Sequence, residues 1–143
     1  FAEKGKGSLQ NDRRIRVSKR NSVSSCIFSI YDDLNIDYKS SEINYLTIIK
    51  NLAIQNSSVI REFGSSALNF AWLASGKIDC LFTRSLSKYQ IACGELLIKE
   101  AGGYISNLKY INAYKAPNDL LIAANPIIHK ELLKKINIKK NNN

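Results

Sequence analysis

The stretch that decides the fold reads Gly64-Ser65-Ser66-Ala67-Leu68-Asn69-Phe70-Ala71-Trp72-Leu73-Ala74-Ser75-Gly76, followed by Lys77-Ile78-Asp79. Between the two glycines the residues are apolar on nearly every side, which predicts a buried helix over 66–75 that Gly76 ends. A short strand over 59–63 precedes this helix, and a strand over 78–83 follows it. The strand–helix–strand order favours an α/β fold with helices packed on a sheet.

The same alternation extends in both directions from this stretch. Apolar residues at three- and four-residue spacing predict helices over 41–55 and 88–101, and Asn125-Pro126 starts a terminal helix. Strands are predicted over 24–31, 104–106 and 120–124, and a hairpin over 2–9 and 13–18 turns at Asn11-Asp12. We therefore predict one α/β unit over 1–138 and a polar tail over 139–143.

Composition excludes several classes of protein. The chain has 143 residues, 45% of them hydrophobic, which excludes disorder for the bulk, and it has no apolar run long enough to span a membrane. The net charge of +9 invites a nucleic-acid interpretation, but the lysines occur with abundant Ile and Asn, which favours compositional drift. The three cysteines fit reduced thiols of a cytoplasmic protein. Because the chain contains no Met, we expect a processed protein or a fragment.

Few residues could carry chemistry. The Gly64-Ser65-Ser66 turn could offer N–H groups and hydroxyls to a phosphate or a sugar, or it could simply cap the helix. Gly94 indicates tight packing. The single histidine, His129, has no partner for a triad, and Glu95 and Glu100 are expected to be solvated. Read without any comparison, the residues identify no enzyme.

Two stretches carry a resemblance to a known family. They are Arg61 to Asp79 and the run Ile91-Ala92-Cys93-Gly94-Glu95-Leu96-Leu97-Ile98-Lys99-Glu100-Ala101-Gly102-Gly103. Both resemble the C-terminal half of the inositol monophosphatase family, bacterial branch, and the 5–18 and 123–126 segments are similar too. The resemblance implies the C-terminal half of a layered α/β/α/β/α sugar-phosphatase fold. It also implies hydrolysis of inositol monophosphate with Mg²⁺.

The resemblance implies substrate contacts at Gly64, Ser65 and Ser66. Thr83 stands where the family has an acidic residue that holds inositol, and Gln90 stands where it has a metal-binding Asp. Gln90 offers only a neutral carbonyl oxygen to a metal and cannot accept a proton. The Asp-Pro-x-Asp-Gly segment that supplies most metal ligands is not in this sequence. No residue is therefore assigned a catalytic role.

These observations lead to three functional hypotheses. The first is a C-terminal fragment, the remnant of a split or decaying gene, that is inactive alone and poorly soluble. The second is a subunit completed by a separate N-terminal half, with Mg²⁺ and inositol phosphate as ligands and a possible homodimer. The third is a binding module for RNA or RNA polymerase, since bacterial members of the family include such proteins.

Overall fold

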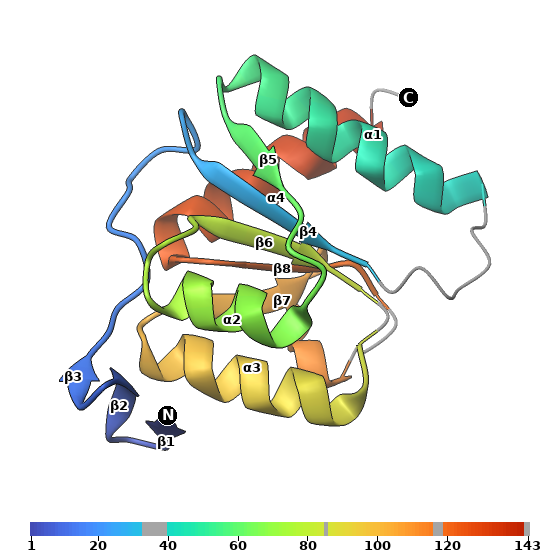
Figure 1. Ribbon diagram of the computed structural model, residues 1–143. Helices are drawn as coiled ribbons and strands as arrows, with labels where there is room; N and C mark the ends of the chain where they lie inside the picture. Colours follow the sequence, from blue (N-terminus) through green and yellow to red (C-terminus); the bar gives the residue numbers. More distant parts are fainter. Residues whose placement is uncertain (33–39, 85, 116–118, 142–143) are drawn as a thin grey trace.

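A five-stranded sheet lies between two pairs of helices in the computed structural model, which describes residues 1–32, 40–84, 86–115 and 119–141 (Figure 1). The strand order is β5 (Val59–Arg61), β4 (Ile27–Tyr31), β6 (Cys80–Thr83), β8 (Leu121–Ala124) and β7 (Tyr104–Asn107). Strands β5 and β6 run parallel to β4, whereas β8 runs antiparallel to both of its neighbours. The α/β prediction is confirmed.

One face of the sheet is covered by α1 (Ser40–Gln55) and α4 (Pro126–Asn141). Helix α4 begins as predicted, because the side chain of Asn125 accepts a hydrogen bond from Ile128 N–H at 2.9 Å. Both helices bury one apolar stripe against Phe28 and Phe82 of the sheet.

The opposite face is covered by α2 (Ser66–Ala74) and α3 (Lys88–Glu100). These helices pack closely because Gly94 lies against Phe70: a Cβ on Gly94 would come within 2.5 Å of the phenyl ring. The tight packing predicted at Gly94 is confirmed.

A small antiparallel ribbon lies beside α3, outside the sheet (Figure 1). It consists of β1 (Ala2–Glu3), β2 (Gly7–Gln10) and β3 (Arg13–Arg14). The Glu100 carboxylate anchors it by accepting hydrogen bonds from Gly5 N–H and Gly7 N–H, both at 2.8 Å. These two bonds hold the pKa of the Glu100 carboxyl below its usual value.

Three expectations need correction. The predicted strand over 2–9 is broken by a turn at Gly5, whose φ is +79°. The strand expected over 13–18 ends at Arg14, because Val17 N–H donates to Ala101 O at the end of α3 instead of to the ribbon. Helix α2 is not buried on every side, since Leu68 is 36% exposed.

A short 3₁₀ turn, η1 (Ala113–Lys115), connects β7 to the segment before β8. Within the described residues, none of the helices has the length and apolar character that a membrane crossing requires.

Candidate functional site

Helices α2 and α3 begin at the same edge of the sheet. The chain runs from β5 through α2 to β6, and β5 and β6 are both parallel to β4. A helix that connects two parallel strands starts where the first strand ends, and α3 likewise follows the end of β6. Ligands of α/β proteins bind at this carboxyl edge, so the predicted site residues lie in a favourable place.

The two serines at the start of α2 have different roles. Gly64 has a φ of +66°, a conformation that favours glycine. Ser65 is the N-cap, and its hydroxyl accepts a hydrogen bond from Leu68 N–H at 3.3 Å. The capping role considered for this turn is therefore confirmed at Ser65, and the Ser66 hydroxyl points to a different partner.

Gln90 connects the beginning of α3 to Ser66. Its Oε1 accepts a hydrogen bond from Ser87 N–H at 2.9 Å, and the Ser87 hydroxyl accepts one from Gln90 N–H, which completes a capping box. Its Nε2 donates to Ser66 Oγ at 2.9 Å. A backbone N–H can only donate, so the contact with Ser87 fixes which end of the amide is oxygen.

A groove of about 370 Å³ lies over this contact, between the outer sides of α2 and α3. Its lining is mostly apolar and consists of Ser66, Ala67, Phe70, Tyr89, Gln90, Cys93, Gly94 and Leu97. Two of the five predicted site residues, Ser66 and Gln90, thus meet in one groove.

Thr83 lies at the end of β6 and lines a different, much smaller hollow of about 10 Å³ with Tyr31, Asp32 and Arg84. Its side chain is buried, and within the described part of the chain its Oγ1 has no hydrogen-bond partner. The structure therefore does not place Thr83 in the groove that Ser66 and Gln90 share.

The ion pair beside Thr83 was missed from the sequence. Arg84 donates from Nε and Nη2 to Oδ2 of Asp32, at 2.8 and 2.7 Å, and the two side chains are only 12% and 11% exposed. Asp32 follows β4 and Arg84 follows β6, so a sequence reading that paired these two strands could have found them. The pair is a fixed polar feature of the carboxyl edge.

Clustered acidic side chains, the usual ligands of Mg²⁺, are absent from the described part of the chain. Over 1–32, 40–84, 86–115 and 119–141, no three His, Cys, Asp or Glu side chains come together. Mg²⁺ needs several anionic oxygens in near-octahedral geometry. The oxygen of Gln90 already accepts a hydrogen bond from Ser87.

Two other carboxylates have structural roles. Asp79 accepts a hydrogen bond from Ile27 N–H at 2.7 Å and lies 3.2 Å from the Arg20 guanidinium. Glu95 was expected to be solvated, but it is buried, accepts a hydrogen bond from the Asn112 side chain at 2.6 Å and pairs with Lys99. Both groups hold elements of the fold together.

Two groups suited to acid–base or nucleophilic chemistry, His129 and Cys26, are buried, whereas the Cys93 thiol is exposed. His129 Nε2 lies 3.0 Å from Ser106 Oγ, but the two residues are 2% and 0% exposed, so a substrate cannot reach them. Burial lowers the pKa of His129 to about 4 and raises the pKa of the Cys26 thiol to about 12. These side chains stabilise the core.

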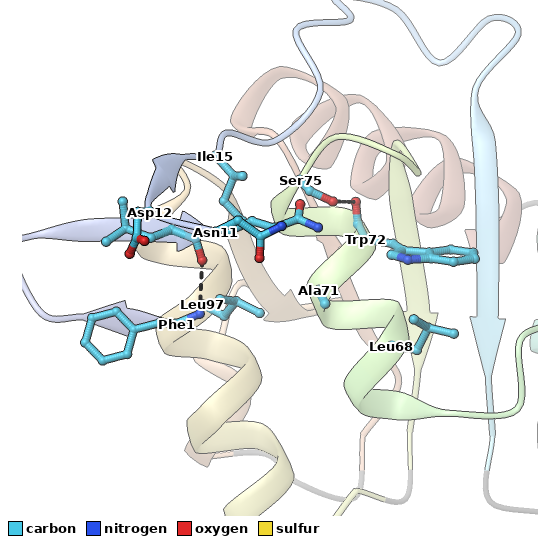
Figure 2. Close-up of a pocket in the computed structure, with 11 residues that line it drawn as sticks. Phe1, Asn11, Asp12, Ile15, Leu68, Ala71, Trp72, Ser75 and Leu97 are labelled. Atoms are coloured by element: carbon cyan, nitrogen blue, oxygen red, sulfur yellow. Dashed lines mark hydrogen bonds between the residues drawn. The ribbon is translucent and has the colours of Figure 1, made fainter.

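A second groove, of about 510 Å³, lies between the ribbon and the far end of α2, where Ile15, Leu68, Trp72 and Leu97 line it (Figure 2). Two of the polar groups drawn there are hydrogen-bonded, Phe1 N to Leu9 O at 3.0 Å and Ser75 Oγ to Trp72 O at 3.3 Å. Together the two grooves make the outer side of α2 and α3 a largely apolar surface.

Comparison with known proteins gives a consistent result. The model of the inositol monophosphatase family matches residues 1–141. The chain is 34% identical to the putative Nus factor SuhB of Neisseria meningitidis serogroup A over 138 residues, which is 94% of this chain and 50% of that protein. It is 35% identical to an inositol-1-monophosphatase of Mesorhizobium japonicum over 135 residues, which is 94% of this chain and 49% of that protein.

A solved structure of a relative has a similar fold over half of its chain. The extragenic suppressor protein SuhB of Bartonella henselae superimposes with a TM-score of 0.80 at 30% identity, over 94% of this chain and 50% of that one. The chain thus spans about half the length of these relatives.

Proposed function

Because this chain belongs to the inositol monophosphatase family, we propose that it forms the C-terminal half of a phosphatase fold and does not hydrolyse phosphate esters on its own. The observation that carries the proposal is the contact between Gln90 and Ser66. At the position where the resemblance implies a charged metal ligand, an amide is held by a neighbouring hydroxyl. Hydrolysis of this kind depends on Mg²⁺ held by several carboxylates, and no three acidic, His or Cys side chains come together in the described residues.

A direct assay tests this proposal. The purified chain is incubated with inositol 1-phosphate and Mg²⁺, and phosphate release is compared with that of the Mesorhizobium relative as the positive control. We expect no release above the buffer blank. Release that scales with the amount of chain and disappears with EDTA would overturn the proposal.

In a completed phosphatase, we assign substrate contact to the start of α2. Gly64 and Ser65 would offer backbone N–H groups to a sugar hydroxyl, and Ser66 would offer its side chain. Thr83 would contribute a neutral hydroxyl where an acidic group is implied. We expect inositol phosphate as the substrate class and Mg²⁺ as the cofactor only of such an assembly.

The apolar outer side of α2 and α3 supports the hypothesis that this chain is a subunit, completed by a separate N-terminal half. Both grooves open on this side, and Leu68 and Tyr89 are 36% and 85% exposed. A separately produced N-terminal half of a relative tests the idea by co-elution in gel filtration. Restored phosphatase activity in the mixture would favour the subunit and contradict the inactive remnant.

RNA or RNA polymerase is the second candidate partner, because some relatives are named Nus factors. The observation in its favour is the exposed basic surface of the ribbon, where Lys4, Lys6, Arg13 and Arg14 are all exposed. Binding through phosphates falls steeply with salt. A gel-shift titration of structured RNA at two salt concentrations, with Arg13→Ala as the variant, would show a salt-dependent loss if this function is correct.

We place the protein in the cytoplasm. The three free thiols, Cys26, Cys80 and Cys93, support a reducing compartment.

A further inference from the structure

The starts of α2 and α3 are joined by side-chain hydrogen bonds of fixed polarity. Ser87 N–H donates to Gln90 Oε1 at 2.9 Å, and Gln90 Nε2 donates to Ser66 Oγ at 2.9 Å. Ser66 is only 7% exposed, and its contact with Gln90 is partly buried. The amide therefore presents its oxygen to α3 and its N–H group to α2.

This polarity is unfavourable for a cation. An N–H donor carries a partial positive charge, and the N-terminal ends of both helices add the positive ends of their dipoles at the same place. A carboxylate at position 90 would instead present an oxygen to Ser66 and to any bound cation. The two alternatives predict opposite responses to a divalent metal.

We propose that Gln90 acts as a clamp that holds the starts of α2 and α3 together and makes this half of the fold independent of divalent metal. The clamp stands at the position where the family resemblance implies a metal-binding carboxylate. The proposal rests on contacts within this chain and not on its lack of phosphatase activity.

A simpler role for Gln90 would be to cap α3 alone. The oxygen and the nitrogen of its side-chain amide distinguish this role from the clamp. Capping uses only Oε1, whereas the clamp uses Nε2. Gln90→Glu keeps an acceptor for Ser87 N–H and turns the donor to Ser66 into an acceptor, to which the Ser66 hydroxyl can donate. Ser66→Ala removes the acceptor and leaves the capping box intact.

The experiment measures amide hydrogen exchange in the first turns of α2 and α3, with Mg²⁺ and with EDTA. In the unmodified chain we expect the same exchange in both buffers, and no line broadening near Ser66 or Gln90 with Mn²⁺. In Ser66→Ala we expect exchange in these turns to rise about fivefold, as the loss of one net hydrogen bond implies. In Gln90→Glu, where the Ser66 hydroxyl can donate to the carboxylate, we expect exchange to differ between the Mg²⁺ and EDTA buffers. Gln10→Glu, the same change at an exposed glutamine of the ribbon, is the matched control.

Three results would overturn the clamp. They are protection by Mg²⁺ in the unmodified chain, Mn²⁺ broadening at Ser66 or Gln90, and unchanged exchange in Ser66→Ala. Ser66→Ala provides the test even if Gln90→Glu fails to fold. Hydrolysis by the unmodified chain would overturn the proposed function and leave this result unaffected.

Discussion

At the scale of single residues, His129 couples folding to pH. It is buried against Ser106 and lies edge-on to Tyr104, with ring centroids 4.8 Å apart. Burial lowers its pKa from 6.5 to about 4, so the folded state favours the neutral ring. The unfolded chain binds the proton more readily, and this contribution to stability is complete above the unfolded pKa and lost as the pH falls towards 4.

We therefore expect the free energy of unfolding to fall by up to about 3 kcal/mol over that pH interval because of His129 alone. Urea unfolding near neutral pH and near pH 4 measures it. His129→Gln provides the comparison, since it keeps a polar side chain but does not titrate. The prediction is wrong if the variant loses as much stability on acidification as the unmodified chain.

Thr83 carries a buried hydroxyl group that bears on the stability of the fold. Its Oγ1 is buried without a hydrogen-bond partner among the described residues, and burying an unbonded hydroxyl is unfavourable. Thr83→Val has nearly the same shape and should raise the free energy of unfolding by about 1 kcal/mol in chemical denaturation. A destabilised Thr83→Val would mean that the hydroxyl has a partner, such as water or a ligand.

At the scale of elements, the packing of α2 against α3 depends on Gly94. A Cβ there would lie 2.5 Å from the Phe70 ring, so Gly94→Ala must push the helices apart or move the ring. Overpacking costs about 1–3 kcal/mol, against about 1 kcal/mol gained from the helix propensity of alanine. We expect a net loss of stability in thermal or urea unfolding. Adding Phe70→Leu should recover part of the loss, and strictly additive effects would contradict the contact.

Local patterns explain how much of these elements could be predicted. The apolar spacing of α1 and α4 and the capping residues Ser65 and Asn125 are readable in the sequence, because each depends on neighbours within one turn. The ribbon was predicted with the right turn at Asn11-Asp12 but with strands that are too long. Their ends depend on Glu100 and Ala101, which lie more than 80 residues away along the chain.

The candidate site was less predictable for the same reason. Its residues could be proposed from the resemblance. The contact between Ser66 and Gln90, however, joins two separate helices, and the sheet determines where each helix lies. The separation of Thr83 from that groove, and the pairing of Asp32 with Arg84, also depend on which strands are neighbours. None of these pairings leaves a periodic signal in the sequence.

At the scale of the whole molecule, each face of the five-stranded sheet is covered by one pair of helices. Helices α1 and α4 lie over one face of the sheet, and α2 and α3 over the other. The outer side of α2 and α3 carries both grooves, with Leu68 and Trp72 along one of them (Figure 2). Contiguous apolar surface of this kind promotes association, so we expect the isolated chain to self-associate as its concentration rises.

Leu68→Lys should weaken this association, because it places a charge at the edge of the apolar surface at a position already 36% exposed. Sedimentation velocity over a range of concentrations measures the effect. Ile54→Lys is the matched control, since Ile54 is 76% exposed on α1, in the opposite helical layer, and lines neither groove. Equal effects of the two substitutions would show that added charge alone, and not the outer side of α2 and α3, governs association. A chain that stays monomeric at all concentrations would show that this surface does not drive self-association.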